Sequence, residues 1–282
     1  MIKEKLLARL EEMGSDGPKR SLGQNFLISE IVVERIIKAV QRYIEGEIVE
    51  IGPGLGSLTD ELIELTKPLT LIELDKKFVE YWRARSEAET AIKINVVEGD
   101  ALRIDWPSVL PPGKAILVSN LPYQISSSLL IDRSLEPFQF SAMILMFQKE
   151  VAQRITAESR NKDYGLLTVI AQNFWRIDLL CECAPRDYYP APNVASRVLI
   201  FKIRTDGLPI SQRPEFLKFV KAGFSHRRKH LFSNLKGQYF SSRNLPADRL
   251  VEAFEKTETS PKARAEELTP EKFKDLFLAA TL

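Results

Sequence analysis

The fold is decided by one stretch of the chain, Glu47-Ile48-Val49-Glu50-Ile51-Gly52-Pro53-Gly54-Leu55-Gly56. Its first half is typical of a buried strand, its second half is a glycine turn, and residues 57–65 have the apolar spacing of a helix. A strand, a glycine turn and a helix make the first unit of a nucleotide-binding sheet, in which glycine lets a ligand approach the backbone. We therefore predict an α/β fold with a Rossmann-like domain.

Two acidic residues follow the next two predicted strands. Residues 69–72 end at Glu73, and residues 94–97 lead into Glu98-Gly99-Asp100. The carboxylate of Glu73 is well placed to accept from both hydroxyls of a ribose, and Asp100 could accept from the amino group of an adenine. Together they outline one nucleoside. Asp75, two residues beyond Glu73, is expected to be an exposed acid at a helix start with no part in the site.

A further apolar run, residues 115–118, leads to Asn120-Leu121-Pro122-Tyr123. The Asn120 side-chain oxygen and the backbone carbonyl of Leu121 or Pro122 could accept the two hydrogens of a purine amine, and Tyr123 could stack on the base. Asn and Pro also favour ordinary turns, which is the plain alternative. The acids upstream favour the catalytic interpretation.

The glycine spacing distinguishes between two cofactors. The turn reads G-x-G-x-G and lacks the G-x-G-x-x-G that seats a pyrophosphate, as a nicotinamide-dependent oxidoreductase would need. Glu50 would repel phosphate, yet it could hold the ammonium group of an amino-acid tail. S-adenosylmethionine has such a tail and no phosphate. A methyltransferase is therefore favoured over an oxidoreductase.

Further elements complete the expected organisation. Strands are predicted at residues 142–147, 168–174 and 198–203, and breakers near residues 205–209 precede a helical pattern. We expect a catalytic domain at residues 1–205, whose residues 1–27 form an N-terminal helix and a cofactor-capping motif. Residues 206–282 would form a smaller α-helical domain.

The motifs resemble, in order and spacing, those of the small-subunit ribosomal RNA adenine dimethyltransferases. The resemblance rests on Lys19-Arg20-Ser21-Leu22-Gly23-Gln24-Asn25-Phe26-Leu27, the turn at Gly52, Ile72-Glu73-Leu74-Asp75, Gly99-Asp100-Ala101 and Asn120-Leu121-Pro122-Tyr123-Gln124-Ile125-Ser126. It covers about residues 19–278. It implies a Rossmann-like, S-adenosylmethionine-dependent enzyme that dimethylates N6 of adenines in small-subunit (16S) ribosomal RNA.

The resemblance also implies the roles of particular residues. The cofactor would be held by Asn25, Leu27, Gly52, Glu73, Asp100 and Asn120. The target adenine would lie at Asn120, Leu121 and Pro122, between Tyr123 and Tyr188. The position of Tyr188 is usually Phe in the family, and that of Ala195 is commonly Asp, which puts one loop-anchoring contact in doubt.

Two other functions remain open. The macrolide-resistance methylases share the catalytic motifs and act on large-subunit RNA, although Phe224-Ser225-His226-Arg227-Arg228-Lys229 and residues 263–269 resemble the small-subunit group more closely. A ribosome-assembly factor that acts mainly by binding the immature small subunit would use the same surfaces.

Charge is distributed unevenly along the chain. From Thr205 onward there are 14 Lys and Arg against 10 Asp and Glu, whereas the preceding residues carry 26 against 28. An excess of basic residues in the smaller domain suits the binding of RNA phosphates. The predicted RNA contacts are Arg227, Arg228 and Lys229, with Lys19 and Arg20 near the cofactor.

Composition excludes several other classes. The two cysteines, Cys181 and Cys183, cannot build a disulfide framework or a zinc site alone, and the apolar runs are too short for a membrane span. His226 and His230 lack the acidic partner of a zinc motif. We expect a cytoplasmic monomer with no metal, no membrane association and no secretory leader.

Overall fold

The computed structural model describes residues 2–14, 17–18, 24–89, 91–110, 114–136 and 140–281. The predicted RNA contacts Lys19 and Arg20 lie outside these residues. The chain forms two compact units. The first contains Met1–Leu129, Phe138–Ala152 and Arg176–Ile203, and the second contains Leu130–Pro137, Gln153–Trp175 and Arg204–Leu282.

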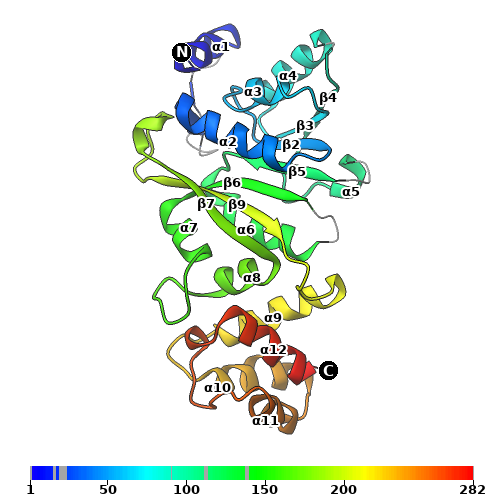
Figure 1. Ribbon diagram of the computed structural model, residues 1–282, viewed down its shortest axis with the longest axis vertical. Helices are drawn as coiled ribbons and strands as arrows, with labels where there is room; N and C mark the ends of the chain where they lie inside the picture. The colour runs from blue at the N-terminus through cyan, green and yellow to red at the C-terminus, as the bar shows by residue number, and fades with distance from the viewer. Residues whose placement is uncertain are drawn as a thin grey trace. The chain divides into compact units, whose positions relative to one another are not determined.

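The first unit is built on a seven-stranded sheet in the order β4-β3-β2-β5-β6-β9-β7 (Figure 1). The strands are β2 (Glu47–Ile51), β3 (Leu69–Glu73), β4 (Ile94–Glu98), β5 (Ala115–Ser119), β6 (Ala142–Gln148), β7 (Trp175–Cys183) and β9 (Ser196–Ile203). The five strands from β4 to β6 are parallel to their neighbours, and β9 pairs antiparallel with β6. The predicted α/β fold is confirmed.

The strand order fixes where a ligand can bind. From β2 the chain builds outward through β3 to β4, and it then returns to the other side of β2 to add β5 and β6. The order therefore reverses between β2 and β5. In open parallel sheets, ligands bind at the carboxyl ends of the strands beside such a reversal. The residues that follow β2, β3, β4 and β5 meet at that edge.

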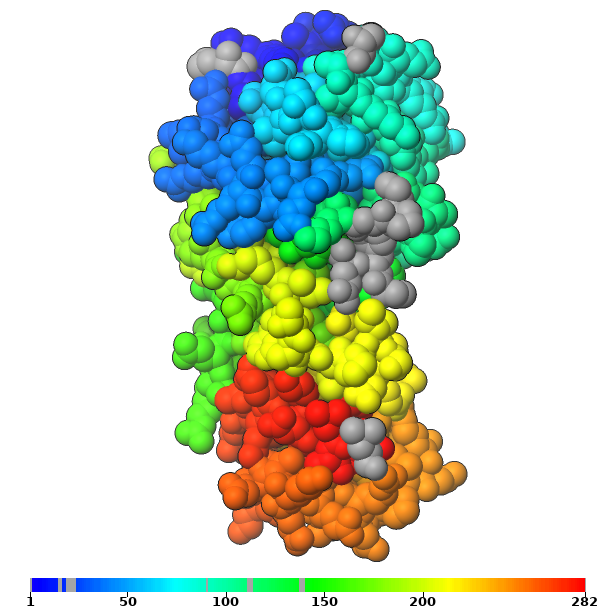
Figure 2. Space-filling model, turned by 45° about the vertical axis from the view of Figure 1, so that its right-hand side comes forward, coloured from blue at the N-terminus to red at the C-terminus, as the bar shows by residue number. Residues whose placement is uncertain are grey.

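Helices flank this sheet (Figure 1). The helices of the first unit are α1 (Ile2–Glu12), α2 (Glu30–Tyr43), α3 (Thr59–Ile63), α4 (Lys76–Ala88) and α5 (Trp106–Val109), together with the first parts of α6 (Tyr123–Leu135) and α7 (Lys149–Ile155), whose last residues belong to the second unit. Helix α2 packs on β5 and β6 through an apolar face that includes Val33, Ile36 and Val40. Its opposite face forms a blue surface patch in Figure 2. A short two-stranded sheet joins β1 (Phe26–Leu27) to β8 (Tyr188–Tyr189).

The second unit is helical, as predicted for the C-terminal part of the chain. Its α-helices are α8 (Leu166–Phe174), α9 (Arg213–Gly223), α10 (Leu231–Leu235), α11 (Ala247–Lys256) and α12 (Pro270–Thr281). Its core contains an aromatic series in which Phe216 contacts both Phe174 and Phe277. The prediction of a strand at residues 168–174 is wrong. Helix α8 is apolar on nearly all sides, and a buried helix of this kind resembles a buried strand in sequence.

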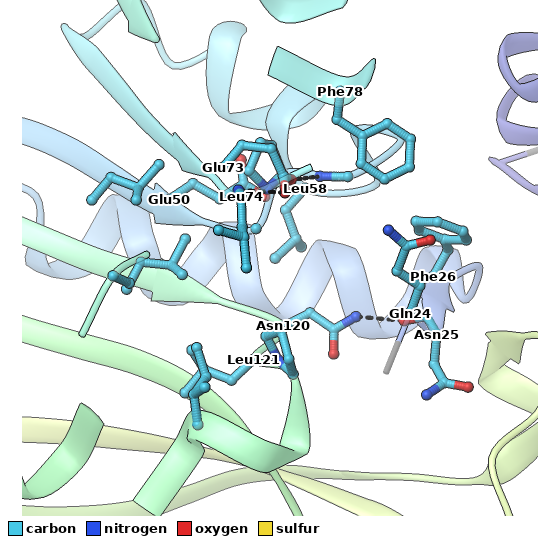
Figure 3. A pocket seen from close by; sticks show the side chains of 18 of the residues that line it. Gln24, Asn25, Phe26, Glu50, Leu58, Glu73, Leu74, Phe78, Asn120 and Leu121 are labelled. Carbon is cyan, nitrogen blue, oxygen red and sulfur yellow. Dashed lines mark hydrogen bonds between the residues drawn. The ribbon is translucent and has the colours of Figure 1, made fainter. Parts of the chain in front are cut away.

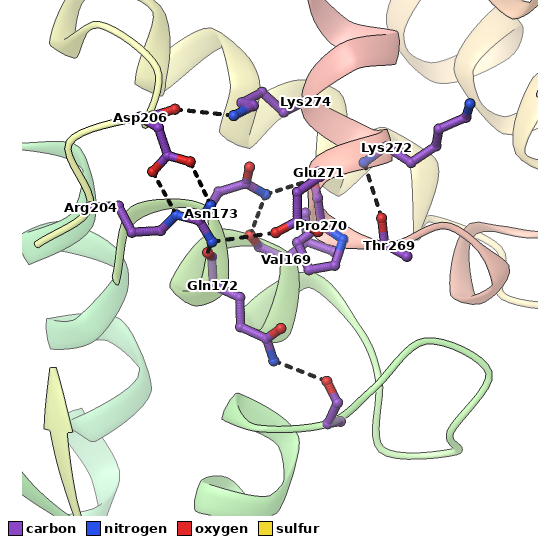
Figure 4. A network of polar contacts seen from close by, with 11 residues as sticks. Val169, Gln172, Asn173, Arg204, Asp206, Thr269, Pro270, Glu271, Lys272 and Lys274 are labelled. Atoms are coloured by element: carbon purple, nitrogen blue, oxygen red, sulfur yellow. Dashed lines mark hydrogen bonds and ion pairs between the residues drawn. The ribbon is translucent and has the colours of Figure 1, made fainter. Parts of the chain in front are cut away.

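A polar network holds helix α8 to residues 204–206 and to the start of α12 (Figure 4). Arg204 donates to the backbone oxygen of Gln172 at 3.2 Å and pairs with Asp206 at 2.7 Å. The Asn173 amide donates to the backbone oxygen of Pro270 at 2.9 Å. These bonds explain why α8 belongs to the second unit. The expected domains, by contrast, place α8 within residues 1–205.

Candidate active site

A cavity lies at the carboxyl ends of β2, β3, β4 and β5, all within the first unit. Its empty space is about 1140 Å³ with the open mouth included. The lining comes from residues 24–27, 50–54, 57–58, 72–74, 99–101 and 120–125, with Phe78 from α4 (Figure 3). The cavity therefore stands at the reversal of strand order, where the fold predicts a ligand.

The glycine turn after β2 forms one wall of this cavity. Gly52 has a φ of +68°, which residues with a Cβ atom rarely adopt, and its N–H donates to the backbone oxygen of Ile72 at 2.8 Å. The turn bends away from β2 immediately after the strand ends. A ligand can consequently approach the backbone closely at this point.

Glu73 is fixed by the backbone around it. One of its carboxylate oxygens accepts from the N–H groups of Leu74 and Asp75 at 2.8 and 2.9 Å, and the other accepts from Gly54 at 3.1 Å (Figure 3). Burial raises the pKa of Glu73, and the three N–H donors oppose that rise. A carboxylate has about four acceptor positions, so the oxygen facing Gly54 retains capacity for a ligand hydroxyl.

Glu50 is the most deeply buried acid of the cavity wall, with 2% of its surface exposed. Its carboxylate accepts from the Thr59 hydroxyl at 2.7 Å. The pKa of Glu50 is raised to about 8, chiefly by burial and in smaller part by the neighbouring acids Asp60 and Glu73, against the lowering effect of the Thr59 hydrogen bond. A cation brought beside Glu50 would favour the ionised form of its carboxylate.

Asp100 lies in the cavity wall, whereas Asp75 lies outside it. Asp100 lines the cavity and accepts from the Leu102 N–H at 3.0 Å, as a short turn after β4 requires. Asp75 begins helix α4, as expected, but the expectation that it is exposed is wrong. It is 6% exposed and accepts from the Gln24 amide at 3.1 Å, which fastens the N-terminal segment beside the cavity.

Asn120 lies at the end of β5 with its side chain oriented by one bond. The amide nitrogen donates to the backbone oxygen of Asn25 at 2.9 Å (Figure 3). Because that carbonyl can only accept, the side-chain oxygen of Asn120 is left for a ligand. Leu121 and Pro122 line the cavity beside it, and Tyr123 begins helix α6.

The two aromatic residues predicted to enclose an adenine differ in exposure. Tyr123 lines the cavity and shares a 2.9 Å hydrogen bond with the Ser196 hydroxyl. Tyr188 is 2% exposed, donates to the sulfur of Met146, and is not among the lining residues. It pairs instead with Leu27 across the β1–β8 ladder. Stacking on Tyr188 stays a prediction that requires its ring to become accessible.

The structure thus brings most of the predicted residues to one cavity. They are Asn25, Leu27, Gly52, Glu73, Asp100, Asn120, Leu121, Pro122 and Tyr123. Sequence reasoning missed Phe78, whose ring meets that of Phe26 edge to face at 6.0 Å. The loop at Ala195 is anchored through its backbone oxygen, which accepts from the Lys149 N–H at 2.9 Å.

The basic cluster in the second unit divides into two kinds of residue. The Arg227 guanidinium pairs with Glu266 at 2.6 Å and donates to the backbone oxygen of Tyr164 at 3.1 Å. Arg228 and Lys229 are exposed. Arg227 therefore has an evident structural role, and the RNA-binding role of the cluster stays a prediction. In the described part of the chain, His, Cys, Asp and Glu form no group of three suited to a metal ion.

Fold and cavity together define the class of the protein. Acids at the ends of successive parallel strands, a glycine turn and an Asn-Leu-Pro-Tyr turn after the fourth parallel strand are the arrangement of an α/β methyltransferase. A family model described as ribosomal RNA adenine dimethylase matches residues 16–281, and the chain belongs to that family. The predicted family and enzyme class are confirmed.

Relatives and solved structures agree with this assignment. The chain is 46% identical over 272 residues to Ribosomal RNA small subunit methyltransferase A of Bdellovibrio bacteriovorus, covering 96% of this chain and 95% of the relative. The protein of the same name from Syntrophotalea carbinolica is 37% identical over 259 residues, covering 91% and 94%.

Two solved structures share the fold at 23% identity. A dimethyladenosine transferase from Plasmodium falciparum has a TM-score of 0.73 and covers 90% of this chain and 96% of its own. The 23S rRNA methyltransferase ErmE has a TM-score of 0.65, with coverage of 92% and 100%.

Proposed function

We propose that this protein transfers two methyl groups in succession from S-adenosylmethionine to N6 of adenines in small-subunit ribosomal RNA, giving N6,N6-dimethyladenosine. The observation that carries the proposal is the orientation of Asn120, whose side-chain oxygen is left as an acceptor at the end of β5. Family membership and the names of the relatives support the same reaction.

The cavity residues suit S-adenosylmethionine. Glu73 retains acceptor capacity for a ribose, Asp100 for an adenine amine, and Glu50 would pair with the ammonium group of the amino-acid tail. Asn25, Leu27 and Gly52 line the same space. Three acids and no Lys or Arg among the described lining residues oppose a phosphate-bearing ligand. When bound, the cofactor would supply a methyl group on a positively charged sulfur.

The remaining chemistry is performed by orientation and electrostatics. The N6 lone pair of adenine is delocalised into its ring, so the nitrogen must become tetrahedral before it can attack. Asn120 and the backbone oxygen of Leu121 or Pro122 would hold the two N6 hydrogens and stabilise the positive charge that develops there. Tyr123 would support the base by stacking. The N6 proton becomes acidic once the nitrogen is alkylated and can then leave to water.

An RNA partner is supported by the loops of the second unit. Three loops converge there, because Arg227 bonds to Tyr164 and Glu266 and the Leu231 N–H donates to the backbone oxygen of Ala263 at 2.8 Å. They carry exposed basic residues, namely Arg160, Lys162, Arg228, Lys229, Lys262 and Arg264. A group of cations contributed by three loops can neutralise several phosphates of a folded RNA.

Location and assembly state belong to the same proposal. We place the enzyme in the cytoplasm as a monomer, and both cysteines are free thiols, as is common in a reducing compartment. No helix in the described ranges is both long and apolar enough to cross a membrane.

The proposal is tested by transfer of labelled methyl groups to unmethylated small subunits, to large subunits and to bare ribosomal RNA, with nucleoside analysis of the products. Dimethyladenosine on small-subunit RNA alone is the expected result. Label on large-subunit RNA would instead assign this protein the function of a resistance-type methylase. Absence of label, with binding to small subunits retained, would support an assembly factor.

A further inference from the structure

We infer that Arg9, on the N-terminal helix α1, is a positioning residue of the cofactor site that holds the glycine turn from behind. The inference rests on the proposed use of S-adenosylmethionine. It adds to that site a residue 43 positions before Gly52, outside every motif of the sequence.

The side chain of Arg9 is buried against the turn, with 6% of the residue exposed. One guanidinium nitrogen donates to the backbone oxygen of Leu55 at 2.5 Å, and the other donates to both carboxylate oxygens of Asp60 at 2.9 and 2.7 Å. Gly52 and Gly54 line the cavity, whereas Leu55 does not. Arg9 therefore supports the turn on the side away from the ligand.

Trp82 of helix α4 completes this support. Its indole N–H donates to the backbone oxygen of Gly54 at 2.9 Å. Gly56 has a φ of +89°, and a Cβ atom there would lie 2.6 Å from the Arg9 guanidinium and 2.7 Å from the Trp82 ring. The third glycine of the turn is thus required by two side chains behind it as well as by its own conformation.

The charges around Arg9 explain why it can stay buried. Asp60 is paired with Arg9, with Lys5 at 2.8 Å and with Arg85 at 2.7 Å. Burial would raise the pKa of Asp60, but these cations hold it below its ordinary value. Asp60 is therefore ionised at neutral pH and fixes the guanidinium in the orientation that reaches Leu55.

The position of the turn matters for ligand binding because Gly54 is bonded on both sides. Its N–H donates to Glu73 and its carbonyl accepts from Trp82. A shift of the Leu55 carbonyl would move Gly54, and with it the carboxylate predicted to hold the ribose. Arg9 would thus affect cofactor affinity without contacting the cofactor.

The test compares Arg9→Met with Arg9→Lys and with the matched control Lys5→Met. Lys5 lies on the same helix and pairs with the same Asp60, but its side chain is 56% exposed and, among the described residues, forms no hydrogen bond with the turn. Methionine keeps an apolar stem beside Trp82 and leaves Asp60 paired with Lys5 and Arg85. The measurements are the Kd of S-adenosylmethionine by calorimetry, the Kd of ribosomal RNA, the KM and kcat for methyl transfer, and thermal unfolding.

We expect Arg9→Met to raise the Kd and KM for S-adenosylmethionine on the order of tenfold, because the turn loses one charge-assisted hydrogen bond, the one to the Leu55 backbone oxygen. The kcat at saturating cofactor and the Kd for RNA should change less than about twofold, and Lys5→Met should resemble the wild type. Arg9→Lys keeps the charge but not the planar guanidinium, so its Kd for S-adenosylmethionine should lie between those of Arg9→Met and the wild type.

A folded Arg9→Met variant with wild-type cofactor affinity would overturn the inference. If that variant does not fold, Arg9→Lys decides alone, and an unchanged cofactor Kd in it would also overturn the inference. Failure of the wild-type protein to bind S-adenosylmethionine would instead refute the proposed function, before any variant is made.

Discussion

Asn120 and Asn25 lie 95 positions apart in the sequence, yet the side chain of the first is oriented by the backbone of the second. The bond determines which end of the amide faces the cavity, because a backbone oxygen can accept a hydrogen bond only from the nitrogen end of the amide. A residue at the end of β5 therefore depends for its orientation on the segment that precedes β1.

Replacing Asn120 should impair chemistry much more than RNA binding. Asn120→Ala removes the acceptor for N6, and Asn120→Asp places a carboxylate against the Asn25 carbonyl. For both variants we expect methyl transfer to fall by about 100-fold or more, with RNA affinity within about threefold of wild type. Single-turnover transfer and RNA titration measure the two effects. Asn95→Ala, on the exposed side of β4, is the control. Equal losses in transfer and binding would contradict the assigned role.

Glu50 should make the protein less stable as the pH rises. Its pKa is about 8 in the folded protein and 4.5 without the fold, so the folded state retains a proton that the unfolded state has released between these values. Stability should therefore fall from pH 4.5 to about 8 and level off above that, by at most about 5 kcal/mol.

Chemical denaturation across this pH range tests the prediction with Glu50→Gln, which keeps an acceptor for Thr59 and cannot ionise. In the variant, the free energy of unfolding should no longer fall with pH on account of this residue. The variant should therefore be more stable than the wild type at pH 9. The exposed Glu61→Gln is the control. Parallel pH profiles for wild type and Glu50→Gln would show that Glu50 does not titrate in this range.

Cofactor affinity should depend on pH in the opposite sense. An ammonium group beside Glu50 favours the ionised carboxylate, so binding would release a proton below about pH 8. The affinity for S-adenosylmethionine should rise as the pH approaches 8, and Glu50→Gln should abolish that rise. Calorimetry in buffers of different ionisation enthalpy measures the proton release directly. A pH-independent affinity in the wild type would place the ammonium elsewhere.

The basic cluster of the second unit should separate into two phenotypes. Arg228→Ala with Lys229→Ala should weaken RNA binding and reduce the slope of log affinity against log salt by about 1.5 to 2, without loss of stability. Arg227→Ala should chiefly lower the thermal stability, because its guanidinium joins Glu266 to the Tyr164 backbone. Salt-dependent RNA titration and thermal unfolding distinguish them. Equal salt slopes for the double variant and the wild type would remove both residues from the RNA contact.

Much of the sheet could be predicted because each strand carries its own signal. The run at residues 115–118 is continuously apolar and is buried in β5, and the Ile and Val side chains of residues 47–51 are buried in β2. Helix α8 carries a signal of the same kind, since a run such as residues 168–174 is equally apolar in either conformation. Only its packing on α9 and α12 decides that it is helical.

The site was predictable where a residue follows a strand directly, as Glu73 and Asn120 do. Arg9 has no such signal, because its contact with the Leu55 backbone oxygen forms only when helix α1 packs against the turn. The burial of Tyr188 was equally hidden. Its neighbour Met146 comes from β6, and nothing in either sequence segment indicates that contact.

The short ladder between β1 and β8 has a thermodynamic consequence. Leu27, predicted to touch the cofactor, and Tyr188, predicted to touch the target base, are partners in that ladder. A ligand that immobilises one strand reduces the entropy cost of immobilising the other, so the two substrates should bind with positive cooperativity. Cooperativity of this kind is reciprocal. RNA already in place would then strengthen the capture of the second cofactor molecule, which favours completing dimethylation before the RNA departs.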